Sequence, residues 1–315
     1  MLDKCHAGQW HADDLDWSAP PPILPRAKEE AVVQAFTDMA GIERLAAALF
    51  TAARAKATDP TLAAIFASFV EDEDRHAVVA QRLARYYDVH HYRDYQLAPA
   101  LRAFREPFLA VIDQAAPEIA NAYVTAGELL LDVALLRSLD DYVGDAMSHQ
   151  AMALINRDES RHIAIDFHMT EVYASDEHLA EMARRPAASW RHRVGTAAAV
   201  ARMLWFAQPF LRQVFLDPID RTDPSGRRLR EALKRIQLIA RKPTVARLPI
   251  MRVMLATQEL YLHPVAGPLL AGVLLRILGA EPRLAARLYT EADLARATAM
   301  SFDELAEDAL AAKLS

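Results

Sequence analysis

Apolar residues recur at intervals of three and four along most of the chain, which is typical of helices with one buried face. The pattern predicts helices over Ala27–Lys56, Thr61–Tyr87, Glu118–Leu139 and Met147–Tyr173, and one from Ala100 that is interrupted at Pro107 and Pro117. The segment Asp88–Pro99 is expected to be a crossover between helices. Gly is scarce and Ala, Leu and Arg are abundant, which favours helix throughout. We therefore expect an all-α fold.

Two of these helices carry the same pentapeptide pattern, Asp-Glu-x-Arg-His, at Asp72–His76 and Asp158–His162. Residues i and i+3 share a helix face, so each Glu-x-x-His presents a carboxylate oxygen and an imidazole nitrogen in one direction. Two such helices that face each other make a mixed oxygen and nitrogen pocket. A pocket of this kind suits a pair of iron or manganese ions.

A solitary glutamate precedes each copy at nearly the same distance, because Glu43 lies 30 residues before Glu73 and Glu128 lies 31 before Glu159. The two copies are offset by 85 and 86 residues, which indicates an internal duplication of a helical hairpin. The candidate metal ligands are therefore Glu43, Glu73, His76, Glu128, Glu159 and His162.

The midpoint of each hairpin predicts a turn. Thr58–Pro60 lies halfway between Glu43 and Glu73, and Val143–Asp145 lies halfway between Glu128 and Glu159. Pro cannot continue a helix, and Gly accepts a positive φ. Both midpoints therefore fit antiparallel helix pairs whose glutamates face each other.

Charged residues beside the candidate ligands suggest a supporting layer. Asp72 and Asp158 stand one turn before the two histidines, and we expect each to accept an imidazole N–H from the histidine of the other copy. Arg75 and Arg161 could neutralise these aspartates. Asp132 lies one turn after Glu128, and the sequence leaves three roles open for it: an additional ligand, a supporting group, or a solvated residue near the helix end.

Four helices that bear Glu, Glu-x-x-His, Glu and Glu-x-x-His resemble the ferritin-like diiron-carboxylate superfamily. The doubled pentapeptide is similar to that of bacterial multicomponent monooxygenase hydroxylases and soluble acyl-carrier-protein desaturases, and the chain length to p-aminobenzoate N-oxygenases. The resemblance covers about residues 29–175. It implies a four-helix bundle with two iron ions, or iron and manganese, that activates O2. Leu131 and Asp132 stand where the first two groups carry a threonine, and Ile155 where the N-oxygenases carry another histidine, so no subgroup is assigned.

The resemblance implies an O2-dependent oxidoreductase that hydroxylates, N-oxygenates or desaturates a hydrophobic substrate. Electrons would come from a ferredoxin or a flavin reductase, and a homodimer is common in the superfamily. Phe66, Phe69, Leu130 and Leu135 are expected to line a dry pocket. The alternatives are a ferroxidase, iron-handling or peroxide-scavenging protein, and a binding protein that has lost its metal. The chain length and the absence of Cys-x-x-Cys disfavour the first, and the complete ligand set disfavours the second.

The flanking regions are interpreted less specifically. Residues 1–28 are expected to form an extended arm, held to the bundle by Trp10 and Trp17. Residues 176–315 are expected to form a helical extension, with an apolar helix over Ala187–Leu216 bent near Pro209. Val265–Ala280 is apolar but shorter than the ~20 residues that span a membrane. A core helix is preferred there over amphipathic insertion into a membrane surface.

Charge is unevenly distributed along this chain of net charge −6. Residues 221–252 contain ten Lys or Arg against Asp223 and Glu231, so this segment carries +8. It is either a solvated helical face or a dock for an acidic partner, such as a carrier protein with a bound substrate. An acidic protein without aromatic residues in its basic segment is not expected to bind nucleic acid. A single cysteine, Cys5, and no apolar leader favour a cytoplasmic protein.

Overall fold

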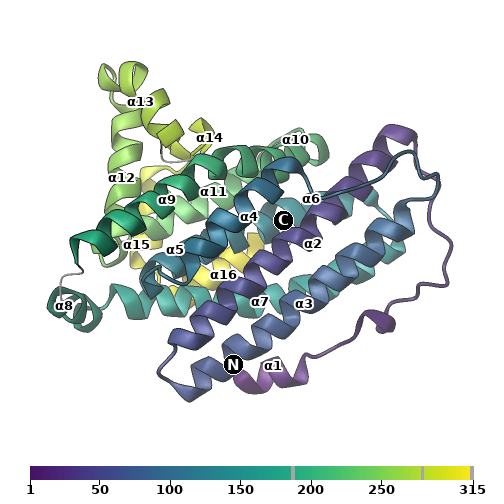
Figure 1. Ribbon diagram of the computed structural model, residues 1–315, viewed down its shortest axis with the longest axis horizontal. Helices are drawn as coiled ribbons and strands as arrows, with labels where there is room; N and C mark the ends of the chain where they lie inside the picture. Colours follow the sequence, from purple (N-terminus) through teal and green to yellow (C-terminus); the bar gives the residue numbers. More distant parts are fainter. Residues whose placement is uncertain (186–188, 278–279, 313–315) are drawn as a thin grey trace.

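The computed structural model describes residues 1–185, 189–277 and 280–312, and these residues form helices and connecting segments without a β-strand (Figure 1). The elements are α1 (Leu2–Ala7), η1 (Ala12–Asp14), α2 (Arg26–Lys56), α3 (Pro60–Tyr87), α4 (Pro99–Ile112), α5 (Pro117–Glu128), η2 (Leu129–Leu136), α6 (Arg137–Val143), α7 (Ala146–Ala174), α8 (Asp176–Arg184), α9 (Trp190–Phe210), η3 (Leu211–Leu216), α10 (Asp217–Thr222), α11 (Arg227–Ala240), η4 (Val245–Arg247), α12 (Pro249–Leu262), α13 (Ala266–Ile277), α14 (Pro282–Ala285), α15 (Glu291–Ala299) and α16 (Phe302–Ala312). The predicted all-α fold is confirmed.

Both predicted hairpin turns are present. Asp59 caps α3, since its carboxylate accepts the N–H groups of Thr61 and Leu62, and Pro60 opens the helix. At the second turn, Gly144 ends α6 with a φ of 72°, a conformation that favours glycine. Asp145 then caps α7. Local sequence therefore sets where each hairpin reverses.

The long helices α2 and α3 pack side by side along most of their length (Figure 1). The second hairpin is less regular, because the continuous helical run from Pro117 to Val143 changes to π-helix at η2. In a π-helix the hydrogen bonds join residues i and i+5, and such segments occur frequently at functional sites. The sequence pattern predicted a helix here but not its change of winding.

The prediction of an extended arm over residues 1–28 is only partly correct, because this segment contains short helices. Residues Leu2–Ala7 form α1, Ala12–Asp14 form η1, and α2 already begins at Arg26. The segment is ordered by packing: Trp10 is 5% exposed, and Trp17 lies against Arg82 and Tyr86. The proline-containing stretch before α2 is the part that has no helix.

Pro107 does not interrupt the helix that contains it, contrary to the prediction. It is a buried residue inside α4, which runs on to Ile112. Proline removes one backbone donor but does not by itself end a helix whose other face is packed. Pro209 likewise lies inside α9, one residue before its end, and η3 follows directly. The first residues predicted for that helix, 187 and 188, lie outside the described residues.

The C-terminal part packs on the two hairpins. Helix α11 packs on η2, α16 packs on α7 and η2, and α9 packs on α4. One hydrophobic core runs through the arm, both hairpins and the C-terminal helices. The segment beyond residue 175 is thus an extension of the same core.

The basic segment 221–252 is largely paired within the chain, so the dock for an acidic partner gains no support from its charge. The following basic side chains of the segment have partners among the described residues. Arg228 pairs with Asp141, Lys234 with Asp293, Arg235 with Glu231 and Asp308, Arg241 with Glu259, Arg247 with Asp176, and Lys242 donates to the carbonyls of Ala297, Thr298 and Met300. These contacts join helices of the extension to one another and to α6 and α8.

The helix predicted over Val265–Ala280 is not a core helix. The described part, α13, buries Leu275 but leaves Leu269 73% exposed, together with most of its other large apolar side chains. Residues 278 and 279 of the predicted range lie outside the described residues. Helix α13 contacts α9 and α12 and protrudes with α12 from the body (Figure 1). The sequence pattern could not tell which apolar helix would be covered.

The helical run Pro117–Val143 is the one described segment whose length and composition would suit a membrane span. Most of its apolar stretch is buried inside the protein, and it carries the buried Glu128. These properties are those of the core helix of a folded domain.

Candidate metal centre

Four helical segments bring the six candidate ligands together. Glu43 comes from α2, Glu73 and His76 from α3, Glu128 from the last residue of α5, and Glu159 and His162 from α7. All six side chains are buried. A hydrophobic core normally excludes ionisable groups, because burying their charge is costly. A metal site requires such a buried cluster, and here six ionisable groups form one.

The six residues form two groups that share members. In one group, ligand atoms of Glu43, Glu73, His76 and Glu159 lie within 4.8 Å of one another. In the other, ligand atoms of Glu73, Glu128, Glu159 and His162 do so. Glu73 and Glu159 belong to both groups. Each group can hold a metal ion, and the two shared carboxylates lie where they can bridge a pair.

The histidines turn one defined nitrogen toward the carboxylates. Nδ1 of His76 lies 3.2 Å from Glu159 Oε1, and Nδ1 of His162 lies 3.0 Å from Glu159 Oε2 and 3.1 Å from Glu73 Oε1. The opposite nitrogens face the aspartates: Nε2 of His76 is 3.2 Å from Asp158, and Nε2 of His162 is 3.4 Å from Asp72. An Nε2–H that donates to a carboxylate leaves Nδ1 free to bind a metal.

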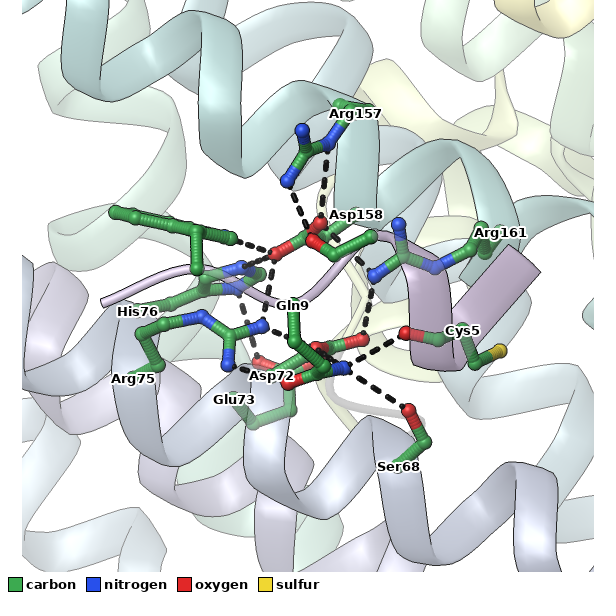
Figure 2. A network of polar contacts seen from close by, with 12 residues as sticks. Cys5, Gln9, Ser68, Asp72, Glu73, Arg75, His76, Arg157, Asp158 and Arg161 are labelled. Atoms are coloured by element: carbon green, nitrogen blue, oxygen red, sulfur yellow. Dashed lines mark hydrogen bonds and ion pairs between the residues drawn. The ribbon is translucent and has the colours of Figure 1, made fainter. Parts of the chain in front are cut away.

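The aspartates therefore contact the histidine of the other copy, as the sequence suggested. Arg161 bridges Asp72 and Asp158 at 2.9 and 2.8 Å, and Arg75 contacts both as well (Figure 2). Burial alone would raise the pKa of Asp158, but hydrogen bonds from His76 and Trp10 and the charge of Arg161 lower it well below its usual range. Both aspartates are thus held as anions behind the imidazoles.

The N-terminal arm closes this layer from outside. Trp10 Nε1 donates to Asp158 over 2.6 Å, and Gln9 donates to Asp72 and accepts from Arg75 (Figure 2). Gly8 passes so close that a Cβ there would lie 2.6 Å from Arg161. The sequence predicted that Trp10 holds the arm, but it gave no signal for Gln9, because these contacts join residues more than 60 positions apart.

The protein alone supplies too few hydrogen bonds to compensate for the burial of the four glutamate carboxylates. Both oxygens of Glu43 and of Glu73, Oε2 of Glu128 and Oε1 of Glu159 are buried without a hydrogen-bond partner among the described residues. Burial, together with the neighbouring carboxylates, raises the pKa of Glu43 and of Glu128 well above the usual range. Four carboxylates match the charge of two divalent cations, so the donor set fits a pair of iron or manganese ions.

Asp132 lies in η2 and is buried, but it belongs to neither group of ligand atoms. Burial excludes one of the three roles considered from the sequence, that of a solvated residue near a helix end. An additional ligand and a supporting group stay the two predicted roles. Leu131 and Ile155, the other positions where the chain departs from its resemblance, are buried apolar residues.

Asp166 is a site residue that the sequence analysis missed. It follows His162 by one turn on α7 and is buried, with Oδ2 lacking a hydrogen-bond partner among the described residues. Burial raises the pKa of this carboxyl well above its usual range, which favours its protonated form. Its i+4 spacing from His162 was the available signal.

A small pocket lies beside Asp166, between α2, α3, α5 and α7. Its lining includes Phe50, Phe66, Asn121 and Val124, and its cavity volume is about 40 Å³. This space is large enough for water molecules, but a large substrate would need movement of its walls. Of the residues predicted to line a dry pocket, Phe66 lines this cavity, whereas Phe69 packs on the His162 ring with centroids 4.1 Å apart, and Leu130 and Leu135 are core residues.

Comparison with known proteins gives no assignment, since no protein-family model matches the chain and no curated protein matches it.

Proposed function

We propose that the chain is a ferritin-like four-helix protein that binds two iron ions, or iron and manganese, and activates O2 to oxidise a hydrophobic substrate. The observation that carries this proposal is the pair of ligand groups that share Glu73 and Glu159. A site for one ion would not need two groups, and a structural carboxylate cluster would need bonding partners that these oxygens lack.

Each side chain has a distinct role in this proposal. Glu73 and Glu159 would contact both ions, Glu43 and His76 would complete one site, and Glu128 and His162 the other. Such a metal pair supplies the two-electron steps that O2 activation requires. Asp72 and Asp158 accept the Nε2–H of the imidazoles, which fixes the tautomer and increases the basicity of Nδ1.

Oxidation of an organic substrate by O2 with insertion of one oxygen atom consumes two electrons and two protons and releases water. A ferredoxin or flavin reductase would supply the electrons. Asp166 would be a candidate proton donor, because burial raises the pKa of its carboxyl and the residue lines the pocket, one turn from His162. Phe50, Phe66 and Phe69 would exclude bulk water from this side of the site.

A second candidate function is the oxidation of ferrous iron or the removal of peroxide. It is favoured by the size of the pocket, which admits small inorganic molecules without rearrangement. Under this alternative the ligands keep the same roles, but no organic substrate enters.

Metal content per chain after anaerobic loading with Fe²⁺ tests the proposal. We expect two irons in the unaltered chain, and an optical change when the loaded protein meets O2. Glu71→Ala is the matched control, because Glu71 is exposed on the same helix as Glu73. Iron content unaffected by Glu73→Ala would refute the site. Continued accumulation of ferric iron beyond two per chain would instead favour the ferroxidase.

A further inference from the structure

Large apolar side chains are exposed on one part of the molecule. Val265 and, on α13, Leu269, Leu270, Val273 and Ile277 are all more than half exposed, and Trp205 on the neighbouring α9 is 62% exposed. We call these six residues the α13 face. Soluble proteins rarely expose a contiguous set of large apolar residues, and such sets mark interaction surfaces.

The spacing shows that this exposure follows from the helix itself. Leu269, Val273 and Ile277 are four residues apart and so lie along one side of α13. Elsewhere on this helix Leu275 is buried, and α13 contacts α9 and α12. Helix α13 therefore has two apolar sides, of which only one is covered within the chain.

Charge around the α13 face is positive, although the protein is acidic overall. The sequence has no Asp or Glu between residues 182 and 216 or between 260 and 280, the stretches that contain α9 and α13. The guanidinium of Arg276 lies 5.6 Å from the centre of the Trp205 ring, and Arg252 is exposed on α12. The acidic residue of α12, Glu259, is held by Arg241 at 2.8 Å. The complementary partner is anionic.

We propose that the α13 face docks on a lipid bilayer that carries anionic headgroups. The apolar side of α13 would lie in the boundary between headgroups and acyl chains, with its axis in the membrane plane. Trp205 would sit at headgroup depth, and Arg276 would contact lipid phosphates. With 12 residues, α13 is too short to cross a bilayer, so the contact is peripheral. This surface is separate from the proposed metal centre.

A second copy of the chain is the less suitable occupant. In a two-fold symmetric contact the same patch meets itself, so Arg276 and Arg252 of both copies would be brought together without acidic partners nearby. An anionic bilayer uses both features of the surface, the apolar residues and the arginines.

Co-sedimentation with vesicles tests the proposal on the full chain. We expect binding to phosphatidylcholine vesicles that contain phosphatidylglycerol, weaker binding without the anionic lipid, and weakening by salt. Leu269→Glu with Val273→Glu should reduce binding about tenfold or more, since both side chains lose their apolar burial. Arg276→Gln should reduce it about fivefold, on anionic vesicles only.

The control is Ile23→Glu, because Ile23 is a strongly exposed apolar residue far from α13 in sequence. It should bind as the unaltered chain does, and circular dichroism should show equal helix content in all variants. Three results would overturn the proposal: no binding to either vesicle, equal loss in the control, or a dimer that Leu269→Glu with Val273→Glu turns into monomers without any vesicle binding. The last result would make the α13 face a subunit interface.

Discussion

The two helical hairpins carry the same candidate ligands on different backbones. From Glu43 to the end of α2 at Lys56 there are 13 residues, and from Glu128 to the end of α6 at Val143 there are 15. In the second hairpin this longer helical stretch includes the π-helical η2, and the loop that follows it is shorter than in the first hairpin. The candidate ligand positions are thus the same in both hairpins, although the helix that follows Glu128 is wound differently from the one that follows Glu43.

The two hairpins also differ in the helices that cover them. Helices α2 and α3 pack chiefly on each other, whereas η2 is covered by α11 and α16 of the C-terminal extension. All eight residues of η2 are buried. An irregular helix with weaker backbone hydrogen bonding is tolerated here because burial of its apolar side chains stabilises it. We infer that the extension supports the second half of the site.

The largest expected effect separates shared from unshared ligands. Glu73→Ala and Glu159→Ala should each abolish binding of both ions, because each removes a carboxylate that belongs to both groups. Glu43→Ala and Glu128→Ala should each leave about one ion per chain. Metal analysis after anaerobic loading measures the difference, and four variants with equal metal content would contradict the shared arrangement.

The supporting aspartates should have the next largest effect. Asp72→Asn and Asp158→Asn keep the shape but remove the charge that holds each imidazole, so metal affinity should fall by about 10–100-fold. Chelator competition measures this. Asp72 accepts from Gln9 and Asp158 accepts from Trp10, so both variants should also weaken a contact with the arm. An exposed control on α3 is Asp74→Asn, which should leave the affinity unchanged.

The pH dependence should be opposite for the metal-free and metal-bound forms. Burial opposes protonation of His76, but contacts with Asp158 and Glu159 outweigh it and raise its pKa to about 9, and Glu43 and Glu128 also have raised pKa values. The folded metal-free protein thus binds more protons than the unfolded chain. Its stability should fall as pH rises from 6 to 9.

Metal ions compete with those same protons, so the stabilisation they confer should grow over the same range. Thermal unfolding with and without Mn²⁺, scanned at several pH values, measures both trends as shifts of several degrees. Parallel curves for the two forms would mean that these groups do not bind the metal.

The smallest effect should come from the arm, where Trp10 and Trp17 donate hydrogen bonds to different kinds of acceptor. Trp10→Phe removes the donor to Asp158, a bond to a charged group worth about 1.5–3 kcal/mol. Trp17→Phe removes a bond to the Ala12 carbonyl and should cost about 0.5–1.5 kcal/mol. Urea unfolding measures the loss of stability in each variant and so shows which loss is larger. An equal cost for both would show that Asp158 does not depend on the arm.

Much of the site could be predicted because its signals are local. The i, i+3 spacing of Glu73 and His76 fixes their common direction on any helix, and the turn residues Pro60 and Gly144 fix where the helices reverse. Asp166 was equally within reach of this reasoning, one turn beyond His162. The change to π-helix at η2 had no such signal, since it depends on what covers the helix.

Sequence by itself determined the helices, the two turns and the six candidate ligands, because helix periodicity, capping and side-chain direction act over a few residues. Only the tertiary structure decided which carboxylates belong to both metal groups, how Gln9 and Trp10 cover the aspartates, that the basic segment is paired internally, and that one side of α13 is left uncovered. These features depend on contacts between segments far apart in the chain, and such contacts are set by the packing of all helices together.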